Sequence, residues 1–167
     1  YQPVDGKVGL SAKEMLSLDS GLSALYIVAA DVALESAAYK TAIDVTEFVV
    51  VQDLFMTETA ALADVVLPAK GPAERDGSYT NLERRVQAFD VGIAPAGLAW
   101  ADWLITTAIA GQLGAEWAFA SADGVMAEIS ETVPMYNQMS FSNLLEPISV
   151  ERQRVHYIYS GMSFTSD

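Results

Sequence analysis

Cysteine is missing from this 167-residue sequence, and histidine occurs only once. Without cysteine the chain forms no disulfide and cannot hold an iron–sulfur cluster through its own thiolates. The lone His156 has no second histidine or cysteine to complete a zinc site, and it anchors no evident Ser–His–Asp arrangement. The sequence also lacks a P-loop and a Gly-x-Gly-x-x-Gly motif, so two common glycine-rich phosphate-binding signatures are excluded.

Basic side chains are scarce as well, since 9 Lys and Arg face 22 Asp and Glu and give a formal net charge of −13. This balance makes nucleic acid and anionic membrane surfaces poor partners. A contribution to solubility alone is the simpler interpretation of the charge, and we prefer it to an acidic binding function. No apolar run reaches the length of a membrane-spanning helix, so we expect a soluble domain without direct membrane insertion.

Hydrophobic residues make up 51% of the chain, which is enough for a substantial core in one domain, or in one domain with a tail. We predict an α/β domain over residues 1–134, with its core at about 22–114, followed by a C-terminal extension over 135–167. Because the sequence begins Tyr-Gln-Pro without a methionine, we expect it to be a piece of a longer protein.

Short apolar runs alternate with helical patterns through the first half of the chain. Strands are predicted at 24–30, 48–51 and 65–67, with an Ala-rich helix at 33–43 and a second helix capped by Thr57 between them. Parallel strands need crossover connections, which are right-handed almost without exception. The predicted fold class is therefore α/β, with a doubly wound, mainly parallel sheet.

Capping and turn residues mark the elements outside this alternation. A loop with little regular structure is expected at 69–81, where Gly71, Pro72 and Gly77 interrupt any pattern. The remaining predicted elements are a helix at 11–18 with a Ser11–Glu14 capping box, a strand at 86–91, a helix at 102–113 stopped by Gly114, a helix at 122–133 capped by Ser121, and a strand at 155–159.

Two carboxylates follow the first two predicted strands, Asp31 after the first and Asp53 after the second. Ligands of open α/β sheets bind beyond the carboxyl ends of the strands, and a carboxylate can accept the paired N–H donors of a guanine edge. Thr57 begins a helix, whose free amides attract phosphate. These residues form a candidate nucleotide cradle, although an Asp that caps a turn and a Thr that caps a helix are the commoner roles.

Three motifs carry a resemblance to a known family. They are VVVQDLFMTETAALADVVLP (Val49–Pro68), ERDGSYTNLERRVQ (Glu74–Gln87) and DWLITTAIAGQLG (Asp102–Gly114). Their order and spacing resemble the molybdopterin-dinucleotide oxidoreductases, and the match extends over about Ala24–Gly114. Within that family the motifs look most similar to the molybdopterin-like domain found in the large peripheral-arm subunit of NADH-quinone oxidoreductase, which is respiratory complex I.

The resemblance implies a Rossmann-like domain of the molybdopterin-oxidoreductase and formate dehydrogenase fold. It also implies that the positions of Asp53 and Thr57 contact the guanine dinucleotide, and that the loop with Asp76 and Gly77 lies close to the pterin. The sequence departs from the family after its first strand. Where the family has a Gly-containing turn followed by Pro, this chain reads Ala-Ala-Asp-Val at 29–32, without the freedom that Gly gives for close approach to a phosphate.

Three functions follow as hypotheses. The first is a non-catalytic scaffold domain in the large peripheral-arm subunit of complex I, without a cofactor of its own, with iron–sulfur clusters only in missing parts of the parent. Its partners would be other subunits of the peripheral arm, in the bacterial cytoplasm at the inner membrane. The alternative is part of a molybdenum enzyme with a bis-pterin guanine dinucleotide, such as formate dehydrogenase. A free-standing nucleotide-binding module is the third.

The charged run at 83–85 has two interpretations. Arg84 and Arg85 could bind a phosphate, because a guanidinium pairs with it bidentately. We prefer a structural role, in which both arginines hold the loop at 69–81 in the absence of a cofactor. Their expected partners are the acidic residues of the loop and of the strand ends: Glu74, Asp76, Asp31 and Asp53.

Overall fold

The computed structural model describes residues 8–145, and the chain divides into two compact units, residues 1–69 and 70–167. The strand predicted at 155–159 and His156 lie outside the described residues. The predicted domain boundary after residue 134 stays a prediction. Within the part that the structure describes, no helix is long and apolar enough to cross a membrane.

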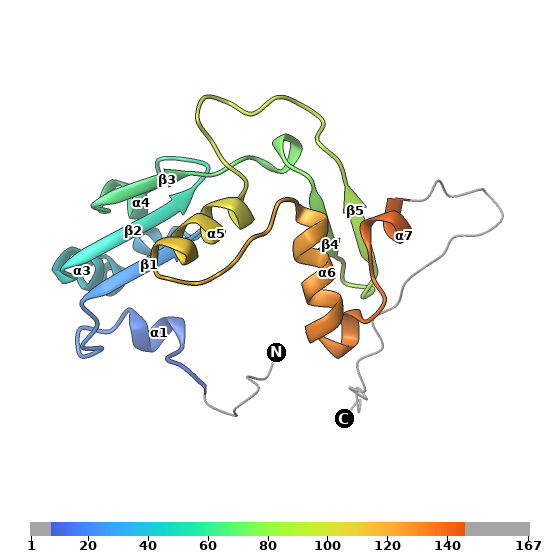
Figure 1. Cartoon of the computed structure of the whole chain (residues 1–167). Coiled ribbons are helices and arrows are strands. Elements are labelled where there is room, and N and C mark those ends of the chain that lie inside the picture. Colours follow the sequence, from blue (N-terminus) through green and yellow to red (C-terminus); the bar gives the residue numbers. More distant parts are fainter. Residues whose placement is uncertain (1–7, 146–167) are drawn as a thin grey trace. The chain divides into compact units, whose positions relative to one another are not determined.

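Unit 1 is built on a parallel sheet of three strands in the order β1-β2-β3 (Figure 1). The strands are β1 (Ala24–Val28), β2 (Phe48–Asp53) and β3 (Val65–Pro68), and β2 pairs in parallel with both neighbours. The α/β class with a parallel sheet is therefore confirmed. The helices of this unit are α1 (Ala12–Met15), α2 (Val32–Glu35), α3 (Ala37–Val45) and α4 (Glu58–Ala61).

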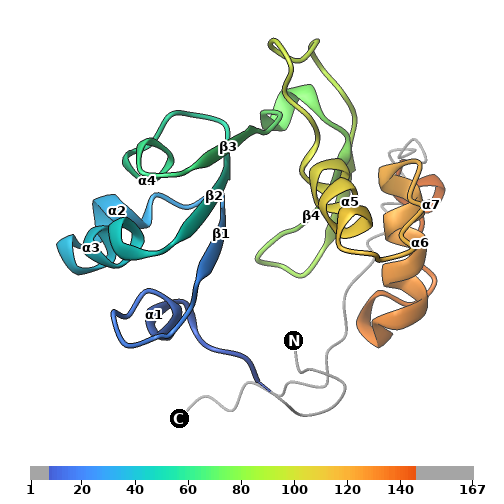
Figure 2. The same cartoon turned by 60° about the vertical axis from the view of Figure 1, so that its left-hand side comes forward.

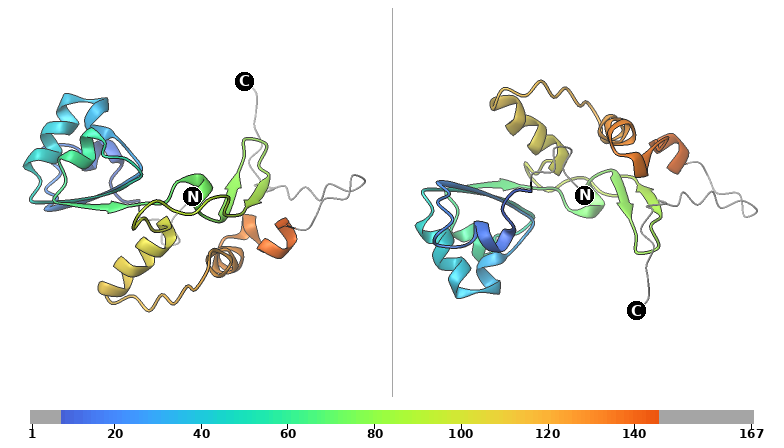
Figure 3. Two further views of the ribbon diagram at one scale, coloured as in Figure 1. Left: turned by 90° about the horizontal axis from the view of Figure 1, so that it is seen from above. Right: turned by 90° about the horizontal axis from the view of Figure 1, so that it is seen from below.

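The helices between the strands lie on one face of the sheet, as Figures 2 and 3 show. Strands in sequential order joined by right-handed crossovers place both connections on the same side. On the covered face Leu25, Val49 and Val51 are buried in a core with Ile43 of α3 and Ala60 of α4. The other face carries apolar side chains together with the buried Gln52, which pairs with Tyr26. There the residues Tyr26, Val28 and Phe48 are 42–46% exposed.

Serine and threonine caps fix where several helices begin. The Ser11–Glu14 capping box is confirmed, since Glu14 bonds the amide of Ser11 at 2.7 Å, although helix α1 already ends at Met15. The single helix predicted at 33–43 is two helices. Ser36 interrupts it with an extended backbone, φ −157° and ψ 134°, and its hydroxyl accepts the amide of Ala38 at the start of α3.

Unit 2 contains an antiparallel hairpin of β4 (Gly77–Thr80) and β5 (Val86–Phe89). The expectation of little regular structure at 69–81 was therefore wrong. A strand as short as β4 is defined by its pairing with β5, which no local pattern reveals. The helices and 3-10 turns of the unit are η1 (Pro72–Glu74), α5 (Asp102–Gln112), α6 (Ala122–Thr132), η2 (Pro134–Tyr136) and α7 (Phe141–Leu145).

The two long helices of unit 2, α5 and α6, lie where the sequence predicts helices. Helix α5 ends close to Gly114, whose φ is +89°, and α6 begins at Ser121, whose hydroxyl accepts the amide of Gly124 at 3.1 Å. Val86, Met126 and Met139 form the buried centre of the unit. Met126 and Met139 serve as core packing, since flexible Met side chains fill irregular gaps.

Candidate functional site

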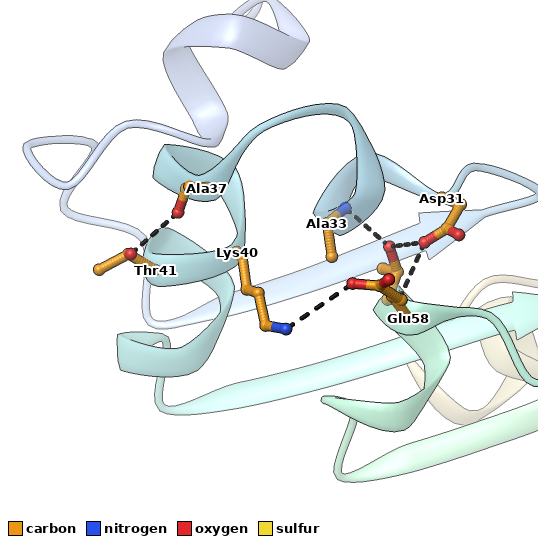
Figure 4. A network of polar contacts seen from close by, with 7 residues as sticks. Asp31, Ala33, Ala37, Lys40, Thr41 and Glu58 are labelled. Atoms are coloured by element: carbon orange, nitrogen blue, oxygen red, sulfur yellow. Dashed lines mark hydrogen bonds and ion pairs between the residues drawn. The ribbon is translucent and has the colours of Figure 1, made fainter.

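The candidate site of unit 1 lies at the carboxyl ends of β1 and β2, where Asp31 and Asp53 leave the sheet. Figure 4 shows the polar contacts around Asp31. One of its oxygens, Oδ1, accepts two hydrogen bonds from Thr59, from the amide at 3.0 Å and from the hydroxyl at 2.8 Å. The Thr59 oxygen in turn accepts the amide of Ala33 at 2.9 Å. Asp31 thus joins the loop after β1 to helix α4.

These contacts keep Asp31 in its charged form. The hydroxyl of Thr59, and then its amide, stabilise the carboxylate and lower the pKa of Asp31 below its usual value. Thr59 is fully buried, so its hydroxyl depends on these protein partners. Asp31, a predicted ligand-binding residue, therefore has an observed structural role, and ligand binding by it stays a prediction.

Asp53 uses one carboxylate oxygen locally. Its Oδ1 accepts the amides of Leu54 at 2.6 Å and Phe55 at 3.4 Å, which turns the chain at the end of β2. Among the described residues, nothing donates a hydrogen bond to its second oxygen, Oδ2. Asp31 is held in the same way, since both of its hydrogen bonds from Thr59 go to Oδ1.

Thr57 is the N-cap of α4, as predicted, and its hydroxyl oxygen accepts the amide of Ala60 at 3.1 Å. The hydroxyl proton is not used by this bond and remains available to a ligand oxygen. Lys40 supplies a cation near this helix and pairs with Glu58 at 3.7 Å (Figure 4). Both of these side chains are about half exposed, so the pair is weak.

Ala29 stands in the turn that follows β1. Its φ is +51°, in the left-handed region that glycine adopts most readily. An alanine thus adopts a turn conformation that glycine adopts without strain. The sequence shows the alanine but not the strained conformation.

The predicted residues Asp76 and Gly77 belong to unit 2. With Trp103, they help to line a cavity of about 150 Å³, and the remaining wall is mostly apolar. The indole Nε1 of Trp103 is buried and has no hydrogen-bond partner among the described residues. Gly77 has a structural reason to be glycine, because a Cβ there would lie 2.8 Å from the ring of Phe89.

Glu74 and Arg75 anchor the segment before β4. The carboxylate of Glu74 accepts the amides of Gly71 at 2.8 Å and Ala96 at 3.0 Å. Arg75 forms a partly buried ion pair with Asp102 in the first turn of α5. The Gly71–Glu74 spacing of a capping box could have indicated the first anchor. No sequence pattern indicates the second, which joins residues far apart in the chain.

The charged run at 83–85 lies in the hairpin turn. Arg85 pairs with Glu83 at 3.3 Å, and Arg84 has a φ of +62° within the turn. The expected reach of Arg84 to the acidic strand ends stays a prediction. Among the residues at 8–145, no group of three or more His, Cys, Asp or Glu side chains is arranged to hold a metal ion.

The parallel sheet places unit 1 in the class of open α/β domains, in which ligands generally bind beyond the carboxyl ends of the strands. The same fold occurs in acetylene hydratase from Pelobacter acetylenicus, at a TM-score of 0.59 and 23% identity, with 72% of this chain and 17% of that chain covered. The sequence profile of the molybdopterin oxidoreductases matches residues 5–112, and the chain belongs to that family.

Relatives in sequence carry the names of formate dehydrogenases. The chain is 37% identical over 146 residues to YrhE of Bacillus subtilis, provisionally named a formate dehydrogenase, across 84% of this chain and 15% of YrhE. It is 40% identical over 144 residues to the F420-dependent formate dehydrogenase 2 subunit alpha of Methanococcus maripaludis, across 83% of this chain and 21% of that protein. The chain thus spans only a small part of these two relatives, and neither is named as a component of complex I.

Proposed function

We propose that this chain is the part of a formate dehydrogenase-like molybdenum enzyme that binds the guanine end of the molybdopterin dinucleotide. The observation that carries the proposal is the 37–40% identity to proteins with formate dehydrogenase names over most of the chain. Because the chain spans 15–21% of those two relatives, formate oxidation would be a property of a longer parent protein.

The carboxyl edge of unit 1 suits a guanine base better than a phosphate. Asp53 offers a free carboxylate oxygen to the N–H donors of the base, and Thr57 offers a hydroxyl proton. The cations of the described part of unit 1 are Lys13 and Lys40, and Lys40 is paired with Glu58. We therefore expect most of the charge that balances the pyrophosphate to come from outside unit 1. The cofactor, when bound, would supply the redox chemistry of the parent.

A scaffold domain in the large peripheral-arm subunit of complex I is the less supported interpretation. The family membership is compatible with it, but the names of the relatives favour the molybdenum enzyme. NADH oxidation, quinone reduction and partners in a peripheral arm therefore stay predictions of the less supported interpretation.

The full-length parent protein tests this proposal. We expect purified parent to contain about one molybdenum per chain and to reduce a viologen dye with formate. A parent without molybdenum that assembles with NADH-oxidising subunits would contradict the proposal and support the scaffold role. The parent gene offers an earlier indication, since a catalytic cysteine or selenocysteine in its flanking regions would favour the molybdenum enzyme.

The binding step can be tested on the 167-residue chain itself. Titration with guanosine diphosphate is expected to give saturable binding that Asp53→Ala abolishes and that adenosine diphosphate does not reproduce. Glu58→Gln is the matched control, because Glu58 is an exposed acid of the same edge whose described partner is Lys40. Equal binding of both nucleotides, or no effect of Asp53→Ala, would contradict the assignment of Asp53.

A further inference from the structure

We propose that Asp31 and Thr59 are a positioning pair, which holds the loop from Asp53 to Thr57 in place for a ligand. The inference rests on the proposed function for the identity of that ligand. The observation behind it is the pair of hydrogen bonds that Asp31 Oδ1 accepts from Thr59, at 3.0 Å and 2.8 Å, across 28 positions of the sequence.

Helix α4 needs support from outside itself. It has four residues, and a helix of that length does not persist alone, because the cost of nucleation exceeds the gain from so few hydrogen bonds. Thr57 caps it from within, through the amide of Ala60. Asp31 holds it from outside, through the amide and the hydroxyl of Thr59. The direction in which the chain leaves β2 at Asp53 therefore depends on a contact with the loop after β1.

The hydroxyl of Thr59 is used completely by this arrangement. Its proton goes to Asp31, and its oxygen accepts the amide of Ala33, the second residue of α2. Thr59 and Ala33 are both buried, so water cannot replace either bond without a rearrangement. One side chain thereby fixes the loops after β1 and β2 relative to each other.

The two carboxylates of the edge consequently have different roles. Asp31 Oδ1 accepts donors from helix α4, 28 positions away in the sequence, while Asp53 Oδ1 accepts the amides of its own turn. A substitution of the buried Thr59 should therefore weaken ligand binding only indirectly, by letting the loop that carries Asp53 move.

The test compares Thr59→Val with Thr59→Ser in the 167-residue chain. Valine keeps the shape of threonine but removes the hydroxyl, and serine keeps the hydroxyl. The matched control is Thr41→Val, since the Thr41 hydroxyl bonds a carbonyl of its own helix, Ala37, at 2.9 Å and takes no part in the pair (Figure 4). The readouts are amide hydrogen exchange at residues 54–57 and affinity for guanosine diphosphate.

We expect Thr59→Val to speed exchange at 54–57 and to weaken nucleotide binding, each by about tenfold, while Thr59→Ser and Thr41→Val stay close to the native chain. Asp31→Asn is the second variant, and it should produce a smaller change because its amide oxygen still accepts. Native exchange rates at 54–57 in Thr59→Val would overturn the inference. A native chain that binds no guanosine diphosphate would overturn the proposed function instead, and the exchange rates would still decide whether the pair holds the loop.

Discussion

Ala29 donates its amide to the carbonyl of Gln52 at 2.9 Å while its own φ is +51°, so an alanine occupies a turn that glycine would fill without strain. A left-handed conformation costs an L-residue roughly 1–2 kcal/mol, and the greater freedom of glycine in the unfolded chain offsets part of that. We expect Ala29→Gly to raise the free energy of unfolding by about 0.5–1 kcal/mol in urea titrations. Ala30→Gly is the control and should destabilise, because Ala30 has no positive φ.

Removal of the N-cap of α4 should destabilise unit 1. Thr57→Ala leaves the amide of Ala60 without its partner and should lower the free energy of unfolding by about 1 kcal/mol. Thr57→Ser keeps the acceptor oxygen and should stay within a few tenths of the native value, roughly the spread among good caps. Thermal unfolding of the two variants measures the difference, and equal losses would show that the methyl group, not the cap, matters.

Gly77 should not accept a side chain. A Cβ at this position would lie 2.8 Å from Cζ of Phe89, and that ring is held by its stacking on Tyr79 at 4.7 Å between centroids. We expect Gly77→Ala to destabilise by about 1–3 kcal/mol, the usual cost of overpacking. In chemical denaturation, the double variant Gly77→Ala with Phe89→Leu should recover part of the lost free energy of unfolding. If the loss came from the backbone alone, the double variant would recover nothing.

The Arg75–Asp102 ion pair should stabilise unit 2 more than a surface pair does. The two side chains are 24% and 28% exposed, so the pair is intermediate between a surface ion pair and a buried one. We expect Arg75→Ala to cost about 1–2 kcal/mol. A double-mutant cycle with Asp102→Ala gives the coupling energy, and a value near zero would show that the contact contributes nothing to folding.

The stability of the chain at acid pH should depend on Asp31. Its pKa is lower in the folded chain than in the unfolded one, chiefly because of the Thr59 hydroxyl. Its contribution is therefore fully present above the unfolded pKa of about 3.9 and is lost as the pH falls through the folded pKa. Asp31→Asn should be less stable than the native chain at pH 7, with a smaller difference at pH 3. Urea titrations at both pH values measure this.

Part of the acid sensitivity should remain in Asp31→Asn. The pKa of Glu14 is also lowered, first by the hydroxyl of Ser11 and then by its amide. Glu14→Gln should therefore also make the free energy of unfolding less dependent on pH. A difference between native chain and Asp31→Asn that is constant from pH 7 to pH 3 would contradict the role given to the carboxylate.

Much of unit 1 could be predicted because its signals are local. The apolar runs of β1, β2 and β3 and the caps at Ser11 and Thr57 each depend on residues a few positions apart. The same is true of Ser121 at the start of α6. The family resemblance also rested on contiguous motifs, and the family profile bears it out.

The hairpin and the loop anchors could not be predicted in the same way. Strand β4 exists because residues 77–80 pair with 86–89, and Arg75 meets Asp102 from a distant part of the sequence. Neither relationship leaves a pattern within one segment. The prediction that Arg84 and Arg85 hold the loop rests on charge, and charge alone does not specify which partner lies within reach.

Short segments of the chain are enough to specify the α/β class, the order of strands and helices in unit 1 and the two acidic strand ends, because periodicity and capping are local properties. The role of each acid, in contrast, depends on the folded chain. The parallel register of β1 and β2 brings Asp31 against Thr59, while Asp53 accepts the amides of its own turn. Such contacts depend on how the crossover connections bring distant segments back to the same edge of the sheet. No single segment of the sequence specifies this.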